Sequence, residues 1–317
     1  MTLDQIKSHL LSISEVSEWP EMEALLQSVL QRAPTASWRY VIAGCESIGG
    51  KPEDALPGAV AVCLMHLSIV LVDDMLDADP KGRHHQFGSA ETANLALALQ
   101  ALSYGLLDKT GIDAQGLRAI HLRLQQMNLR TAYGQHRDAG EVAGESDYWH
   151  IVDAKSASLP SSTLYLGAIL GGSSLQTADQ LGYYGALLGR SVQINDDVAD
   201  ALETPAKPDW QRQHNNLPIL YALTVDHDHR NEFQALLPSV HEPDILQRAQ
   251  QILVASGALS YCAYKLFELY QEADDYLNSL SLPNPSPLKQ LLEDQIQPMR
   301  ETFASLKIDL PTLRTSS

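Results

Sequence analysis

The sequence predicts an all-α fold in which roughly ten helices form one bundle. Three observations lead to this prediction. Apolar residues recur at spacings of three and four along most of the chain, as in 22–30 and 95–106, which is typical of amphipathic helices. Alternating runs of β-branched residues, typical of strands, are scarce. Gly, Pro, Asn and Asp gather in short breaks that separate segments of helical length.

The breaks bound the expected helices in order along the chain. They lie at 32–36, 49–57, 78–88, 109–113, 138–146, 171–176, 203–216, 239–243 and 282–287. Because these breaks are short, and neither a repeat of solenoid length nor a low-complexity linker occurs, residues 1–317 are predicted to form a single domain. The segment after Pro287 is expected to close the bundle as an amphipathic helix, and 311–317 to form a frayed tail.

Two of these helices carry further expectations. The most apolar stretch, Gly58–Val72, is shorter than the roughly 20 residues that span a membrane, and it contains His66 and Ser68. We therefore expect a buried core helix and no stable membrane insertion. Farther along, Pro160 follows Lys155 by five residues and is expected to break or kink that helix. The kink would either free carbonyl groups toward a cavity or have no functional consequence.

Composition narrows the classes of partner and the compartment. A formal net charge of −17 and an isoelectric point near 4.9 argue against a nucleic-acid surface, which needs a basic stripe. The three cysteines are widely spaced and form no CxxC pair, and the N-terminus lacks the basic and apolar regions of a signal peptide. These features favour a reduced, cytoplasmic protein whose anionic ligands would need a metal ion.

Three carboxylates end the most apolar helix. Residues four apart share a helix face, so Asp73 and Asp77 stack, while Asp74 stands about 100° round. Because the residues upstream are apolar, this first aspartate cluster terminates a buried helix instead of decorating a solvated one. Like charges at such short range repel each other, which calls for bound cations.

A second aspartate cluster, Asp196, Asp197 and Asp200, repeats the same spacing behind another largely apolar run, 185–195. Oxygen ligands suit Mg²⁺, which typically links carboxylates to substrate phosphates. A single motif of this kind is about as often a solvated helix end as a metal site. Two copies, each behind an apolar run, favour a magnesium site and a phosphorylated substrate.

The order of the motifs from about Ala36 to Leu223 resembles that of the trans-isoprenyl diphosphate synthase, or polyprenyl synthetase, family and its terpene-synthase relatives. His66, which lies seven residues before Asp73, also matches the family. Further markers, with the family motif in parentheses, are Gly134–Asp138 (GQxxD), Tyr148–Ala157 (Y…K(T/S)A), Gly189–Asp200 (GxxxQxxDDxxD) and Leu217–Leu223 (TLPxIYAL). The resemblance implies an isoprenoid-synthase helical bundle around a central cavity.

The resemblance also implies roles for individual residues. The two aspartate clusters would hold about three Mg²⁺ ions around a prenyl diphosphate substrate. Lys155 and Gln193 would contact the diphosphate or the nearby carbocation. Arg39, His66 and Arg83 would remain from the basic set that binds isopentenyl diphosphate in chain-elongating members. Relatives are usually homodimers, so a homodimer is implied as well.

Three basic positions of the family pattern hold other residues. Ala36 stands in place of a lysine, Gly82 in place of an arginine beside Lys81, and His214 in place of a second lysine. Charge-assisted hydrogen bonds contribute about 1.5 to 3 kcal/mol each. These replacements should therefore weaken the binding of a second diphosphate.

Two main hypotheses for the activity follow. The favoured one is a class I terpene synthase that ionises a preformed prenyl diphosphate and releases a hydrocarbon or alcohol. The second is a chain-elongating prenyl diphosphate synthase that consumes isopentenyl diphosphate. A third, a non-catalytic partner subunit, would be expected to lack some of the aspartates.

Two pairs of residues near the first aspartate cluster complete these expectations. By the same resemblance, the non-aromatic Ser68 and Ile69 leave room for a deep pocket and a C20 substrate, linear or already cyclised. His84 and His85 are expected to be solvated, and we assign them no role.

Overall fold

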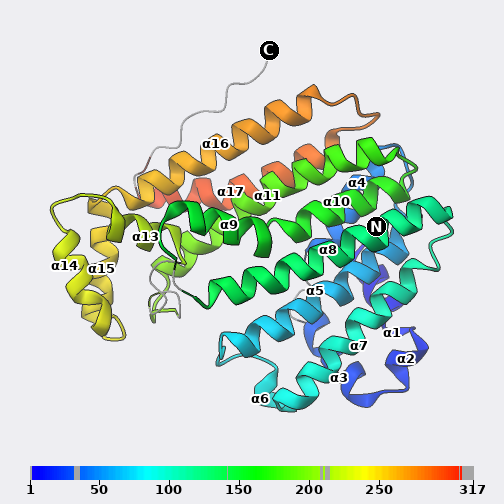
Figure 1. Cartoon of the computed structure of the whole chain (residues 1–317), viewed down its shortest axis with the longest axis horizontal. Helices are drawn as coiled ribbons and strands as arrows, with labels where there is room; N and C mark the ends of the chain where they lie inside the picture. The colour runs from blue at the N-terminus through cyan, green and yellow to red at the C-terminus, as the bar shows by residue number, and fades with distance from the viewer. Residues whose placement is uncertain are drawn as a thin grey trace. The chain divides into compact units, whose positions relative to one another are not determined.

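The computed structural model describes residues 2–31, 36–140, 142–207, 210, 215–306 and 308. Every regular element in this part of the chain is a helix, which confirms the all-α prediction (Figure 1). The elements are α1 (Leu3–Leu11), α2 (Ser14–Ser17), α3 (Pro20–Gln31), α4 (Ser37–Ser47), α5 (Leu56–Leu76), α6 (His84–Phe87), α7 (Ser89–Leu107), α8 (Ala114–Asp138), α9 (Glu145–Lys155), α10 (Ser158–Leu170), α11 (Leu175–Leu202), α13 (Leu217–Thr224), α14 (Arg230–Leu236), η1 (Leu237–Ser239), α15 (Pro243–Ala255), α16 (Ala258–Ser279) and α17 (Ser286–Ser305).

Where the structure describes the residues, the expected breaks occur within a few residues of their predicted positions, although Trp210, inside the predicted break 203–216, is helical. Residues 32–35, 208–209 and 211–214 of these breaks lie outside the described part, which holds more helices than the roughly ten predicted. Some breaks, such as Ser12–Ile13, Ser156–Ala157 and Ser256–Gly257, span only two residues. Ser12–Ile13 and Ser156–Ala157 contain no Gly, Pro, Asn or Asp and give no clear turn signal, whereas Gly257, with φ +84°, is a turn signal that the prediction missed. The predicted tail, 311–317, lies outside the described residues.

The helix that ends at Lys155 shows the expected effect of Pro160. α9 stops at Lys155, and α10 starts at Ser158, so Pro160 lies in the first turn of a new helix. Proline is tolerated there because the first amide groups of a helix have no partner within it. The sequence therefore produces a break and not a kink.

The chain divides into two compact units, which we describe separately; the single domain and its central cavity stay predictions. The first unit consists of Met1–Gln126, Leu159–Gly185 and Ser281–Leu288. Its centre is α5, which packs against α4 and α7 (Figure 1). The side chains of Val60, Leu64 and Leu95 are fully buried there. Burial of this apolar helix stabilises the first unit.

The length predicted for the apolar stretch was too short. α5 runs for 21 residues, because the helix begins ahead of Gly58 and continues through Asp73 and Asp74. By length and composition it is the one described helix that passes as a possible membrane span, with a bent pair, α15 and α16, as a second candidate. Of the apolar window in α5, 56% is buried inside the protein, as in the core helix of a soluble protein. The absence of membrane insertion stays a prediction.

Glycines bring α4 and α10 into close contact within the first unit. A Cβ atom on Gly44 would lie 2.8 Å from the Leu164 carbonyl oxygen, and one on Gly171 would lie 2.7 Å from that of Cys45. A Cβ atom on Gly167 would overlap the Val41 carbonyl oxygen. Only glycine leaves room for the two backbones at these positions.

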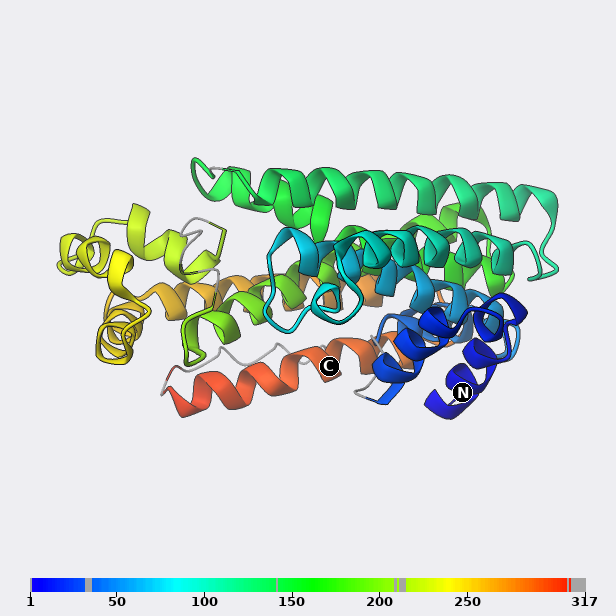
Figure 2. The ribbon, with the colours of Figure 1, turned by 90° about the horizontal axis from the view of Figure 1, so that it is seen from below.

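The second unit consists of Met127–Ser158, Ala186–Leu280 and Lys289–Ser317. Within it, α13 packs against α9, α14, α15 and α16, and both views show α13, α14 and α15 grouped together (Figures 1 and 2). Trp210, which is fully buried, lies with its ring centroid 6.1 Å from that of Phe233. Elsewhere in this unit, the Leu217 N–H at the start of α13 donates to the Asp197 carboxylate near the end of α11, where the second aspartate cluster lies.

Candidate active site

The first aspartate cluster lies at the carboxyl end of α5, in the first unit. Asp73 and Asp74 belong to its last turn, and Asp77 caps the helix, with its N–H donating to the Asp73 carbonyl at 2.9 Å. All three side chains are partly exposed. The carboxyl end of a helix carries a partial negative charge, which disfavours carboxylates and favours a cation. The local backbone thus adds to the repulsion among the aspartates.

The electrostatics of Asp74 reflect this crowding of negative charge. Burial, and then the carboxylates of Asp79 and Asp73, raise the pKa of Asp74 above its ordinary value. Hard, crowded oxygen ligands fit Mg²⁺, which keeps several water ligands and takes others from substrate phosphates. Within the described ranges, no three His, Cys, Asp or Glu side chains already converge on one metal position. The aspartates thus fit Mg²⁺ as a partial ligand set.

The loop after the first cluster explains one departure from the family pattern. A Cβ atom on Gly82 would lie 2.6 Å from the His84 ring and 3.0 Å from the Asp79 carbonyl oxygen. An arginine at Gly82 would therefore need His84 to move. Arg83 is partly buried, and its Nη1 lies 3.5 Å from Gln86 Oε1.

His66 lies on α5, two turns before Asp73. It is partly buried, and its Nδ1 is buried without a hydrogen-bond partner. Burial lowers the pKa of His66 to about 4, so the ring is neutral near pH 7. Arg39 lies on another helix, in the first turn of α4, and is exposed. Position His214 lies outside the described residues.

The second aspartate cluster lies at the carboxyl end of α11, in the second unit. Asp196 is exposed, and the Asp200 side chain is 37% exposed, with Lys207 Nζ 3.9 Å from its carboxylate. Asp197 differs sharply, because only 1% of it is exposed. The outer two carboxylates are therefore accessible to a metal ion, whereas the middle one faces the protein interior.

Hydrogen bonds from Tyr148, Leu217 and Gln193 are among those that hold the Asp197 carboxylate. Oδ2 accepts from the Tyr148 hydroxyl at 2.7 Å and from the Leu217 N–H at 2.8 Å, and Oδ1 accepts from Gln193 Nε2 at 2.7 Å. Burial, and then the Asp197 charge, raise the pKa of Tyr148 well above its ordinary value. The Tyr148 hydroxyl is therefore a donor at every working pH. The ligand role predicted for Asp197 stays a prediction.

Lys155 and Gln193 are each held by hydrogen bonds within the second unit. Lys155 Nζ donates to Asp138 Oδ2 at 2.7 Å, and Gln193 Oε1 accepts a short hydrogen bond from the Ser156 hydroxyl. A Cβ atom on Gly134 would lie 2.7 Å from the Lys155 amide nitrogen, so glycine permits α8 to approach the end of α9. The GQxxD motif thus supplies both the glycine that admits Lys155 and the aspartate that pairs with it.

Sequence reasoning gave no role to Tyr148, Ser156, Asp138 or Asn216. The first three lie inside the quoted motifs, so the motifs were the available signal. Asn216 caps α13 through its side chain and donates from Nδ2 to the Asp197 carbonyl at 2.8 Å. Its role follows from packing, which no local sequence pattern reveals.

Comparison with known proteins places these motifs in one family. The polyprenyl synthetase family model matches residues 37–253. The chain is 28% identical to the geranylgeranyl diphosphate synthase of Mycobacterium tuberculosis, over 68% of this chain and 67% of that protein. It is 26% identical to the short chain isoprenyl diphosphate synthase of Methanothermobacter thermautotrophicus, over 78% and 76%.

Other relatives are matched in part or in fold. The geranylgeranyl diphosphate synthase of Methanosarcina mazei is 29% identical to the chain. This match covers 50% of the chain and only 52% of that relative. The crystal structure of geranylgeranyl pyrophosphate synthetase from Pyrococcus horikoshii shares the fold, with a TM-score of 0.82 and 19% identity over 93% of this chain and 95% of that one. The motifs, the fold and the family match agree, and the chain belongs to the polyprenyl synthetase family.

Proposed function

We propose that the protein is a chain-elongating trans-prenyl diphosphate synthase. The observation that carries the proposal is the polyprenyl synthetase match over residues 37–253, together with relatives named as synthases of prenyl diphosphates. The sequence favoured a terpene synthase because three basic positions are replaced. The comparisons favour chain elongation over a terpene synthase, since the relatives reported above are named for diphosphate products. The non-catalytic hypothesis has no support, because both aspartate clusters are complete.

The proposed reaction joins isopentenyl diphosphate to an allylic diphosphate. The C–O bond of the allylic substrate breaks, a C–C bond forms to the terminal alkene carbon of isopentenyl diphosphate, and a proton leaves. The products are a longer prenyl diphosphate, inorganic diphosphate and the proton. The protein's task is to hold both substrates, promote loss of the first diphosphate and exclude water from the cation.

Both aspartate clusters provide ligands to Mg²⁺ in this proposal, with three ions implied by resemblance. Asp196 and Asp200 present accessible carboxylates in the second unit, as the first cluster does in the first unit. When bound, Mg²⁺ neutralises the negative charge that develops on the leaving diphosphate. The fit rests on oxygen ligands at two helix ends where a cation is favoured.

Lys155 and Gln193 bind the allylic diphosphate end of the substrate in this proposal. Lys155 is oriented by its ion pair with Asp138, in which both side chains are mostly buried, at 23% and 14% exposed. An ammonium group held in this way has little rotational freedom left to lose when a phosphate binds. Gln193 lies on α11 one turn before Asp196 and Asp197, and its side-chain amide contacts the diphosphate in this proposal.

Arg39, His66 and Arg83 bind isopentenyl diphosphate in this proposal. A neutral His66 still donates one N–H to a phosphate oxygen, although it adds no charge. Lys81, which is exposed beside Gly82, supplies a cation near the position of the missing arginine. The retained groups therefore support binding of the second substrate, but more weakly than a full basic set would.

A substrate or product of up to about 20 carbons, a homodimer and a cytoplasmic location complete the proposal. Ser68 is fully buried, and its hydroxyl is bonded to the Met65 carbonyl at 2.7 Å, so it presents little bulk to an isoprenoid chain. The Mycobacterium tuberculosis relative is named for geranylgeranyl diphosphate, a product of this length.

Product analysis tests the proposal. Purified full-length protein with Mg²⁺ is incubated with geranyl, farnesyl or geranylgeranyl diphosphate, each with and without labelled isopentenyl diphosphate. The extracts are split, one half is dephosphorylated, and both are analysed by gas chromatography and mass spectrometry. We expect a longer labelled prenyl alcohol, seen only after dephosphorylation and only when isopentenyl diphosphate is present.

Two variants control this experiment. Asp196→Asn removes one accessible carboxylate and should reduce activity by about a hundredfold or more, as loss of transition-state charge stabilisation does. Asp228→Asn removes an exposed carboxylate outside both clusters and should keep wild-type activity. A hydrocarbon or alcohol formed without isopentenyl diphosphate would restore the terpene-synthase hypothesis.

A further inference from the structure

Gln193 is held on both sides of its amide group, within the second unit. Its Nε2 donates to Asp197 Oδ1 at 2.7 Å, and its Oε1 accepts from the Ser156 hydroxyl. An ionised carboxylate can only accept hydrogen bonds. Gln193 must therefore direct its NH₂ group to Asp197 and its carbonyl to Ser156. This chemistry determines which way round the amide lies.

The orientation of Asp197 depends in turn on two donors from other helices. Oδ2 accepts from the Tyr148 hydroxyl on α9 and from the Leu217 N–H at the start of α13, at 2.7 and 2.8 Å. These bonds prevent the buried carboxylate from rotating, and so Oδ1 stays directed at Gln193. Of these two donors, the Leu217 N–H belongs to the backbone, and Tyr148 is the one whose side chain can be changed.

Tyr148 is itself well placed for this task. It is 2% exposed, and its ring packs edge-on against Trp149, with ring centroids 5.1 Å apart. It precedes Lys155 by seven residues, or about two turns of the same helix. One helix, α9, therefore supplies a residue predicted to bind diphosphate and an anchor for a second such residue.

We propose that Tyr148 is a positioning residue that orients the Gln193 amide toward substrate through the Asp197 carboxylate. The middle aspartate of the second cluster then serves mainly as a buried hydrogen-bond acceptor, and the outer two carboxylates serve as the accessible metal ligands. The kinetic part of this inference rests on the proposed condensation reaction; the structural part does not.

A double-mutant cycle tests the kinetic part. Tyr148→Phe removes the hydroxyl and keeps the ring. We expect kcat to fall about tenfold to a hundredfold, while the KM for isopentenyl diphosphate changes less than about twofold. Gln193→Met should have a similar effect, and adding Tyr148→Phe to it should cost little more, because the tyrosine acts through the glutamine. Multiplicative losses in the double variant would overturn the inference.

Tyr184→Phe is the matched control. Tyr184 is also fully buried, and its hydroxyl donates one hydrogen bond, to the Leu288 carbonyl at 2.9 Å, but it lies in the first unit. The variant loses a buried tyrosine hydroxyl without touching Gln193. We expect wild-type kinetics from Tyr184→Phe, and the same loss of kcat as in Tyr148→Phe would contradict a specific role for Tyr148.

A spectroscopic measurement on the substrate-free protein separates this inference from the proposed function. The side-chain amide resonances of Gln193 are assigned by their loss in Gln193→Met. Tyr148→Phe should shift them, and Tyr184→Phe should leave them unchanged. If the wild type condenses no substrates, the proposed function fails. The change in the Gln193 amide signal then decides the inference alone. An unchanged Gln193 signal in Tyr148→Phe would overturn the inference.

Ser156→Ala provides a second route if Tyr148→Phe does not fold. It removes the donor on the other side of the Gln193 amide from a partly exposed position at the end of α9. We expect Ser156→Ala to shift the Gln193 amide signal as Tyr148→Phe does. Ser156→Thr keeps the hydroxyl and should leave the signal at its wild-type position. An unchanged amide signal in Ser156→Ala would contradict the hold on both sides of the Gln193 amide from which the inference is argued.

Discussion

At the scale of single residues, His66 is a polar side chain in apolar surroundings. It lies on the apolar helix α5 with Nδ1 buried and unpartnered, and burial lowers its pKa to about 4. The unfolded chain binds a proton near pH 6.5, where histidine ordinarily titrates. Between these two values the unfolded state holds more protons than the folded state. Stability should therefore fall as the pH falls from 6.5 to 4.

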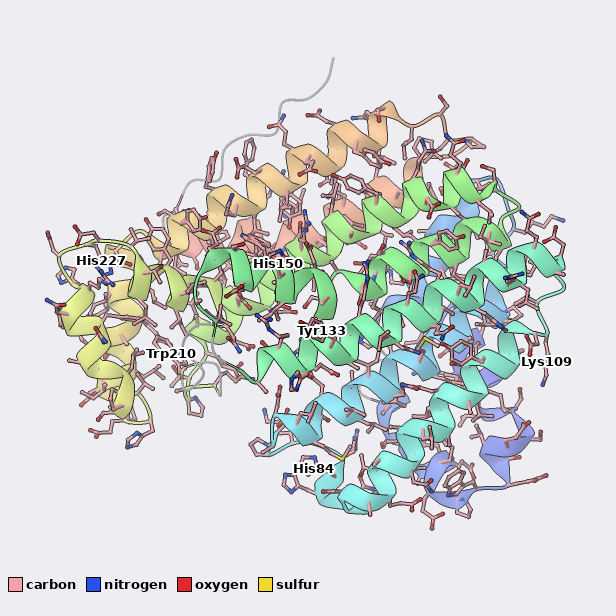
Figure 3. The ribbon with its side chains drawn as sticks, viewed as in Figure 1. His84, Lys109, Tyr133, His150, Trp210 and His227 are labelled. Atoms are coloured by element: carbon pink, nitrogen blue, oxygen red, sulfur yellow. The ribbon has the colours of Figure 1, made fainter. Side chains whose placement is uncertain are left out.

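This difference predicts a measurable loss of stability in acid. His66 alone should lower the free energy of unfolding by up to about 3 kcal/mol between pH 6.5 and 4. Urea unfolding, followed by circular dichroism without substrate, measures the change. His66→Gln should remove most of this pH dependence, and His150→Gln, which alters an exposed histidine of α9 (Figure 3), should keep the wild-type slope. Identical slopes for His66→Gln and the wild type would contradict the prediction.

The sequence showed the chemistry and spacing of the candidate site residues, but it did not show the surroundings of each. The aspartates, Lys155 and Gln193 stand in ordered motifs, so their chemistry and spacing were visible. The burial of Asp197 was not, because Asp196 and Asp197 are neighbours in the same motif and differ only in the direction each takes from α11. That direction matters because Tyr148 and the start of α13 surround Asp197, whereas Asp196 faces solvent.

At the scale of helices, glycine decides how closely two of them pack. A Cβ atom on Gly167 would overlap the Val41 carbonyl oxygen, in the contact between α10 and α4. Gly167→Ala should destabilise the protein by about 1–3 kcal/mol, since a helix would have to shift. Urea unfolding measures this change.

Gly105→Ala on α7 is the matched control. Its added Cβ would meet no atom within 4 Å, and the position is exposed within a helix. We expect it to stabilise the protein by about 0.5–1 kcal/mol, because alanine favours helix over glycine. Equal effects of the two substitutions would refute the close-packing account.

Helix boundaries were predictable where turn-forming residues cluster. Such breaks separate α5 from α7 and α11 from α13 near their expected places. The break at Ser156–Ala157 was only indicated, through Pro160, because two residues with ordinary helix propensity give no signal of their own. Which helices pack together was not predictable, because it depends on glycines whose role appears only when two backbones meet.

At the scale of the whole molecule, exposed apolar side chains suggest where a second copy binds. Leu129 and Tyr133 are 72% and 57% exposed, and they lie four residues apart on one face of α8. Tyr133 is labelled in Figure 3. Exposed apolar groups that share a face are typical of an interface. We therefore predict that the homodimer expected from resemblance uses this part of α8.

Light scattering after size-exclusion chromatography measures the assembly. The wild type should have twice the chain mass of 34.8 kDa, and Leu129→Glu combined with Tyr133→Glu should shift it toward a monomer. Tyr264→Glu, which changes a tyrosine 51% exposed on α16, is the control and should stay dimeric. A dimer that survives both glutamates would place the interface elsewhere.

The activity of the whole molecule was predictable only as a class. Both aspartate clusters led the sequence analysis to predict diphosphate chemistry, but the replaced cations at Ala36 and Gly82 led it to favour loss of the second substrate. Charge counting cannot decide this, because binding also depends on hydrogen bonds from neutral groups such as His66 and on substrate-bound metal ions. Family comparison supplied the evidence that favours chain elongation.

The release of inorganic diphosphate is the measurement that tests chain elongation most directly. Release is followed in real time with Mg²⁺ and farnesyl diphosphate, with and without isopentenyl diphosphate, while label from isopentenyl diphosphate is counted in the prenyl product. We predict that rapid release requires isopentenyl diphosphate and that one labelled unit enters the product for each diphosphate released. Release at the same rate without isopentenyl diphosphate, with no label incorporated, would contradict chain elongation and identify a terpene synthase.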